Sequence, residues 1–158
     1  MKISYHISSC ECDYRDYLRV KDYSSFFGCE FDLKISESLT INSELHKSFL
    51  IVFFRELEYI FKRKKKKKDD CELQAFGWSI IYIIKIEGKK IYIKEYDEYD
   101  RKTKSVSYLD KHDFMEALKT FLGKYKREII SIQPDVIHSS EFKELEEQFQ
   151  KTLKTASL

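Results

Sequence analysis

The chain has 158 residues, which is enough for one domain with a sizeable core and too few for two independent cores. Hydrophobic residues make up 42% and charged residues 35%, a mixture typical of soluble globular proteins. The 29 basic and 27 acidic residues leave a net charge of +2, too balanced to indicate a nucleic-acid-binding protein by total charge. The single proline and four glycines argue against a disordered or linker-rich chain.

The compartment is predicted from the start of the chain and from the cysteines. The first residues, MKISYHISS, contain one lysine with no apolar stretch after it, so no secretory signal is expected. The longest apolar runs, residues 49–54 and 80–84, are too short to span a bilayer. Four cysteines without a signal indicate free thiols in a reducing environment. We therefore expect a cytoplasmic protein without a membrane partner.

Two short strands are expected in residues 1–36, separated by a long stretch without a clean period. Apolar and polar residues alternate in both segments, as they do in strands with one buried face. The apolar members are Ile3, Tyr5 and Ile7 in the first strand, and Phe31, Leu33 and Ile35 in the second.

A first helix is expected over residues 40–66. Thr40 or Asn42 can serve as its N-cap, because a short side-chain oxygen accepts a hydrogen bond from an unpaired backbone N–H. Apolar residues then recur at helical spacing, and the middle of the helix is apolar nearly all round. The stripe consists of Leu45, Phe49, Val52, Phe53, Leu57 and Ile60.

Residues 73–109 predict a three-stranded antiparallel meander. Gly88 lies in a tight turn, where it provides a positive φ. One face of the sheet is expected to be core, while the other is apolar at its centre and charged at its ends. The expected core face holds Phe76, Trp78, Ile80, Tyr82, Ile84, Ile86, Ile91 and Ile93. The opposite face holds Ile81, Ile83, Lys85, Tyr92, Lys94 and Tyr96.

Two further helices are expected, over residues 110–130 and 139–154. Asp110 is a natural N-cap for the first, and Ser139 or Ser140 caps the second after Pro134 breaks the chain. The order of elements predicts a single α+β domain. It contains an antiparallel sheet of about five strands with the meander at its centre, packed by two to three helices.

No metal site or cofactor is expected. His6, Cys10 and Cys12 lie close together in the sequence, followed by Cys29 and Cys71, but their spacing does not match paired C-x2-C zinc ligands. None of the four histidines, His112 included, has the sequence context of a catalytic base. No phosphate-binding, nucleophile-elbow or zinc-protease motif is present, so a binding protein is expected rather than an enzyme.

A basic run follows the first helix. Its lysines could neutralise phosphates of a nucleic acid, but the run lacks the interleaved aromatic residues of a base-stacking surface. The other interpretation is a solvated helix end, which the following acidic pair, Asp69 and Asp70, favours. The run comprises Lys62, Arg63, Lys64, Lys65, Lys66, Lys67 and Lys68.

The second turn of the meander is rich in carboxylates and tyrosines. Tyrosine is a rigid anchor at protein interfaces, and carboxylates beside it would complement a basic active site on a partner. The other interpretation is a charged turn that keeps the sheet from pairing with other chains. The predicted partner-binding residues are Tyr92, Glu95, Tyr96, Asp97, Glu98, Tyr99 and Asp100.

The layout resembles the immunity proteins of bacterial polymorphic-toxin and contact-dependent growth inhibition systems. Three segments carry the resemblance: INSELHKSFLIVFFRELEYI, WSIIYIIKIEGKKIYIKEYD and VSYLDKHDFMEALKTFL. It implies a cytoplasmic protein that binds one toxin domain, such as a nuclease, and blocks its active site. No family motif carries a functional residue over to this chain. A nucleic-acid-associated protein and a small enzyme of unknown reaction are the two alternatives.

Overall fold

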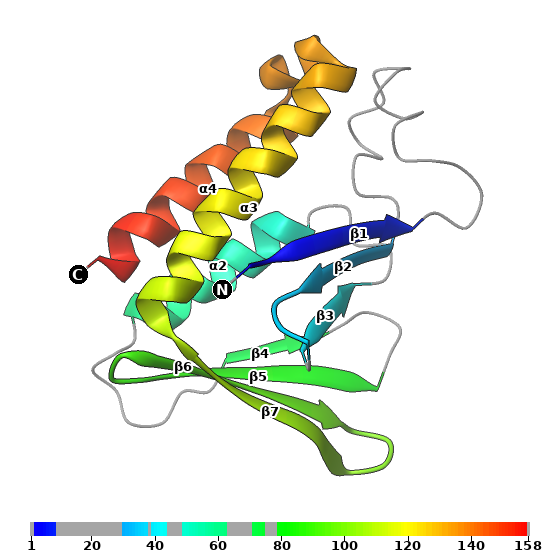
Figure 1. Ribbon diagram of the computed structural model, residues 1–158, viewed down its shortest axis with the longest axis vertical. Coiled ribbons are helices and arrows are strands. Elements are labelled where there is room, and N and C mark those ends of the chain that lie inside the picture. Colours follow the sequence, from blue (N-terminus) through cyan, green and yellow to red (C-terminus); the bar gives the residue numbers. More distant parts are fainter. Residues whose placement is uncertain are drawn as a thin grey trace.

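The computed structural model describes residues 2–8, 30–37, 39–43, 49–62, 71–74 and 79–157, which form an α+β fold with antiparallel sheets (Figure 1). The strands are β1 (Ser4–Ser8), β2 (Glu30–Lys34), β3 (Thr40–Ser43), β4 (Cys71–Gln74), β5 (Ile80–Glu87), β6 (Lys90–Asp97) and β7 (Lys102–Asp110). The helices are α2 (Phe49–Lys62), α3 (Lys111–Ile132) and α4 (Ser140–Ala156), with a short 3-10 helix, η2 (Pro134–His138), between the last two.

The strands of the described residues form two sheets instead of one sheet of about five strands. The first has the order β1-β2-β3 and the second the order β4-β5-β6-β7. Every neighbouring pair is antiparallel. Neither β3 nor β4, each of which has four residues, was predicted from the sequence. A segment this short carries too few alternating positions to be recognised without its partner strand.

The prediction that Thr40 or Asn42 caps the first helix is wrong, because both lie in β3. Asn42 is paired with Asp32 and Thr40 with Lys34. A tight turn precedes the strand, in which the N–H of Ile35 donates to the carbonyl oxygen of Leu39 over 2.9 Å. The buried apolar residues on both sides of this turn, Ile35, Leu39 and Ile41, hold β3 against β2, and α2 spans Phe49–Lys62 in the described part of the chain.

The meander forms as predicted in its described part. Gly88 has a φ of 62° in a two-residue turn between the paired residues Glu87 and Lys90. The described residues of the expected core face belong to the buried cluster or pack against it: Tyr82, Ile84, Ile91 and Ile93 are buried, and Ile80 and Ile86 are partly buried. Phe76 and Trp78 lie outside the described residues.

Both predicted C-terminal helices are confirmed, together with their caps. The Asp110 carboxylate accepts a hydrogen bond from the N–H of Asp113 over 3.1 Å, and the Ser139 hydroxyl accepts one from Phe142 over 3.1 Å. These side chains satisfy N–H groups that have no partner within their helices. Pro134 begins η2, where the chain changes direction between the helices.

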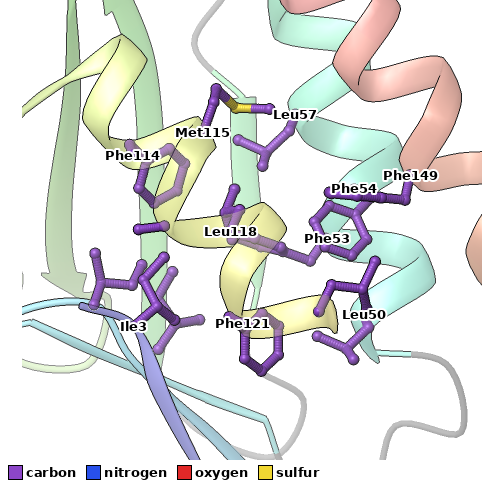
Figure 2. Close-up of a cluster of buried hydrophobic side chains, with 14 of the residues drawn as sticks. Ile3, Leu50, Phe53, Phe54, Leu57, Phe114, Met115, Leu118, Phe121 and Phe149 are labelled. Carbon is purple, nitrogen blue, oxygen red and sulfur yellow. The ribbon is translucent and has the colours of Figure 1, made fainter. Parts of the chain in front are cut away.

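The core lies between the helices and the sheets. Figure 2 shows Leu118 and Phe121 of α3 beside Phe53 and Leu50 of α2, with Phe114 and Ile3 in the same cluster farther from α2. On the far side of α2, the rings of Phe54 and Phe149 approach to 4.9 Å between centroids, which joins α2 to α4. The Tyr82 hydroxyl donates to the carbonyl oxygen of Thr40 over 3.0 Å and so links β5 to β3. The helices therefore lie on one side of the four-stranded sheet (Figure 1).

Candidate protein-binding surface

The turn between β6 and β7 is organised by one carboxylate. Asp97 Oδ1 accepts hydrogen bonds from the N–H groups of Tyr99 (3.0 Å) and Asp100 (3.1 Å) and from the Ser79 hydroxyl (2.9 Å). The backbone N–H of Glu98 also donates to the carbonyl oxygen of Ser79, over 2.7 Å. An aspartate that binds N–H groups two and three residues ahead mimics a backbone turn. The hairpin end is thus held in one shape before any partner binds.

Lys104 completes this turn from the returning strand. Its Nζ lies 3.2 Å from Asp97 Oδ2 and 3.5 Å from Asp100 Oδ2. The N–H of Asp100, the Ser79 hydroxyl and Lys104 together lower the pKa of Asp97 to about 2. Asp97 in turn raises the pKa of Lys104. Both groups therefore stay charged across the physiological range, and Asp97 is only 8% exposed.

The hairpin tip has mixed charge, although it was predicted to be acidic. Between residues 97 and 104 the carboxylates are Asp97, Glu98 and Asp100, and the basic residues are Arg101, Lys102 and Lys104. The three negative and three positive charges balance, so this turn is not a purely acidic surface that would complement a basic cleft.

The face of the four-stranded sheet turned away from the helices carries a tyrosine and lysine surface. We call it the outer face. Its described members are Ile81, which is buried, and Ile83, Lys85, Tyr92, Lys94, Tyr96, Val106 and Tyr108, which are partly buried or exposed. The rings of Tyr92 and Tyr108 meet edge to face at 5.2 Å. Lys85 Nζ lies 5.9 Å from the centre of the Tyr92 ring, and Lys94 Nζ lies 5.1 Å from that of Tyr96. These contacts hold the aromatic rings in place across neighbouring strands.

The structure divides the seven predicted partner-binding residues into three groups. Tyr92 and Tyr96 lie on the outer face, whereas Glu98, Tyr99 and Asp100 are exposed at the tip, where Tyr99 is 87% exposed. The Asp97 carboxylate is engaged in the hydrogen bonds that hold the turn. Glu95 likewise accepts a hydrogen bond from the Ser105 hydroxyl, over 2.9 Å.

Two surface residues were missed by the sequence analysis: Val106, 45% exposed, and Tyr108, 59% exposed. The alternation of Val106 and Tyr108 with Ser105 and Ser107 was visible in the sequence. That alternation does not by itself say which face is buried. The register places Ser107 beside Ile93 and therefore toward the core, so Val106 and Tyr108 face outward.

The described residues include only part of the other candidate sites. Lys62 ends α2 and contacts Glu58 at 2.5 Å, whereas residues 63–68 of the basic run lie outside the described residues, as do Cys10, Cys12 and Cys29. Exposed oxygen and nitrogen atoms of Asp110, His112 and Asp113 lie within 4.8 Å of one another. Because the Asp110 carboxylate already caps α3, this group is explained as a helix start.

Comparisons with family profiles, with curated proteins and with solved structures found no match. In the described part of the chain, none of the helices combines the length and the apolar character needed to cross a membrane.

Substituting Asp97 by alanine is expected to loosen the hairpin tip without disturbing the core. Because the folded-state pKa is lowered, the carboxylate stabilises the fold fully above its unfolded pKa of about 3.9. That contribution is lost as the pH falls toward about 2. Amide exchange at Tyr99 and Asp100 should therefore be faster in Asp97→Ala at neutral pH, and the difference should shrink in acid. Glu98→Ala is the matched control, and equal exchange in both variants would contradict the role of Asp97.

Proposed function

We propose that this chain is an immunity protein that binds a cognate bacterial toxin domain and neutralises it by covering its active site. The observation that carries the proposal is the preorganised hairpin tip, which presents Tyr99 on a turn held by Asp97. It lies at one end of the sheet that carries the outer face. Together they form a surface with a rigid aromatic anchor, charges of both signs and exposed apolar area, the composition that protein interfaces favour.

Rigidity of the tip supports binding energetically. A partner that contacts a fixed turn does not have to order it, so less conformational entropy is lost on association. Tyrosine adds a large apolar ring with few rotatable bonds and a hydroxyl for hydrogen bonding. The tip therefore combines a fixed backbone with an exposed tyrosine, as residues at the centre of a protein interface do.

Charge at the tip supports recognition more than affinity. Glu98 and Asp100 are exposed carboxylates, with Arg101 and Lys102 next to them. On a toxin with a basic cleft, such as a nuclease, the carboxylates would face the cleft and the basic residues its rim. Exposed charges of this kind mainly accelerate encounter and select the partner.

The outer face supports a protein partner better than a nucleic acid. Base stacking requires an accessible ring face. Lysine ammonium groups of the chain itself already lie over Tyr92 and Tyr96. A stacked base would have to displace them.

The first test is neutralisation in cells. The chain is co-expressed with the toxin domain encoded next to its own gene, and growth and co-purification are measured. Protection together with a stable complex is the expected result. Failure to protect and to form a complex with that toxin would contradict the proposal.

Substitutions at the tip then locate the contact. Tyr99→Ala is expected to weaken toxin binding about 30-fold, the effect of losing roughly 2 kcal/mol at an interface centre. Glu98→Lys is expected to slow association, with an effect that fades at high salt. Surface plasmon resonance across a salt series measures both.

The control for these variants is Glu87→Lys, in the hairpin at the opposite end of the same sheet. Glu87 is exposed and is also followed by a tight turn, so the control makes the same charge change on a similar turn. Equal effects of Glu87→Lys and Glu98→Lys would show that total charge, and not the tip, determines the association rate.

A further inference from the structure

We propose that β7, along the edge that no described strand pairs with, pairs antiparallel with β7 of a second copy, which would make the protein a two-fold dimer through one continuous eight-stranded sheet. This inference goes beyond toxin binding and does not depend on it. It is carried by the position of β7, by the direction of its backbone groups and by its distribution of charge.

β7 is the last strand of its sheet in the described part of the chain, and it is long. It has nine residues, whereas β4 at the opposite edge has four. A short edge strand offers few hydrogen-bonding groups to another chain, but a long one offers a row of them. Figure 1 shows β7 along the outside of the molecule, with β6 on its other side.

The hydrogen-bond pattern shows which backbone groups of β7 point outward. The N–H of Lys111 donates to the carbonyl oxygen of Lys89 over 2.7 Å, so residues 89 and 111 form a hydrogen-bonded pair. Hydrogen-bonded and open pairs alternate along an antiparallel ladder. Leu109 and Ser107 therefore bond to β6, while Tyr108 and Val106 direct their N–H and C=O groups toward the free edge.

Only one half of this edge is protected against pairing. Near the tip, a bulge opposite Glu95 and Tyr96 disturbs the strand, and Lys102 and Lys104 add charge. Bulges and edge lysines are the usual means of preventing strand addition. From Ser105 to Leu109 the strand is uncharged, and Val106 and Tyr108 are exposed there.

The charges at the two ends of β7 select an antiparallel copy. Lys102 and Lys104 lie at its start and Asp110 at its end. With the two-fold axis at Ser107, antiparallel pairing places Lys104, which also contacts Asp97 and Asp100, opposite the exposed helix-capping Asp110 of the other copy. Parallel pairing would place like charges together. With the two-fold axis at Ser107, Val106 lies opposite Tyr108 of the second copy. Both residues direct their backbone N–H and C=O groups outward, so Val106 of one copy and Tyr108 of the other can form hydrogen bonds with each other.

The tips stay available in this arrangement. Glu98 and Tyr99 lie about 8 residues from the axis, or roughly 25 Å along the strand, and the two tips point in opposite directions. One strand pair buries little area, so the dimer is expected to dissociate on dilution. Such a dimer would present two toxin-binding tips.

The test is the molecular mass of the full chain in a concentration series by sedimentation velocity. The unmodified chain is expected to shift from monomer to dimer as the concentration rises. Val106→Pro removes an outward N–H without removing a bond to β6, so it is expected to stay monomeric. Val106→Lys places a charge on the open half of the edge and should act in the same way, which keeps the test valid if the proline variant misfolds.

Two control variants separate the edge from other surfaces. Val106→Thr keeps the branched shape and the N–H, so it should still dimerise. Tyr92→Ala removes the ring that contacts Tyr108 on the outer face but leaves the outward backbone groups of β7 in place, so it should also dimerise. The proposal is overturned if the unmodified chain is monomeric at every concentration, if the dimer survives Val106→Lys, or if Tyr92→Ala abolishes it.

Discussion

Substituting Phe54 by alanine is expected to lower the free energy of unfolding by about 3–5 kcal/mol, the range for removing a buried aromatic ring. Phe54 is fully buried in α2. The centroid of its ring lies 4.9 Å from that of Phe149 of α4 and 5.7 Å from that of Phe53. The variant loses both the burial of the ring and its packing partners, and it leaves a cavity between the helices. Urea unfolding followed by circular dichroism measures the loss.

A surface pair between the same two helices is the control. Arg55 donates to Glu144 over 3.1 Å, and both side chains are 55% exposed. Exposed ion pairs contribute little, so Arg55→Ala is expected to cost no more than about 1 kcal/mol. If Arg55→Ala destabilised the protein as much as Phe54→Ala, the contact between α2 and α4 would not depend on the buried rings.

The second large effect is expected at the buried polar contact between α2 and α4. Gln148 Nε2 donates to Glu58 Oε2 over 2.7 Å, and Lys62 Nζ lies 2.5 Å from the other oxygen. Glu58→Ala leaves the Gln148 amide buried without this acceptor, which costs about 1–3 kcal/mol. Replacing both Glu58 and Gln148 by leucine removes both polar groups, so the double variant should be near the unmodified stability or above it.

A double-mutant cycle with Glu58→Leu, Gln148→Leu and the combined variant measures this coupling. Additive effects of the two single substitutions would show that the hydrogen bond contributes nothing specific.

Acid should weaken the same contact. The hydrogen bond from Lys62 is the main cause that lowers the pKa of Glu58, followed by the one from Gln148. Because the pKa is lowered in the folded state, the contribution is complete above the unfolded pKa of about 4.3 and declines as the pH falls below it. On acidification the unmodified chain is therefore expected to lose more of its free energy of unfolding than Glu58→Leu, which lacks this carboxylate.

Local signals in the sequence predicted much of the fold. The caps at Asp110 and Ser139, the turn at Gly88 and the break at Pro134 each depend on the residue itself and its immediate neighbours. These features were predicted at the right positions. The period-2 alternation in β5 and β6 also identified the buried face, because both strands carry enough alternating residues for the pattern to be clear.

The candidate site was predicted less well, because its residues act through partners distant in the sequence. Asp97 looked like a surface carboxylate, but Ser79, just before β5, and Lys104, on β7, both reach it. Glu95 is similar, since Ser105 lies opposite it across the hairpin. A list of carboxylates in one turn cannot show which of them are already engaged.

The sequence by itself determined the local elements of this protein: its capped helices, its glycine turn and the alternating strands of its meander. Propensity, capping and periodicity are properties of neighbouring residues, so they can be recognised without a fold. Only the tertiary structure decided that Thr40 to Ser43 pair as a strand, that Ser107 and not Val106 faces the core, and that β7 is an edge. Strand pairing joins residues far apart in the chain, and the register of that pairing determines which side chains remain at the surface for a partner.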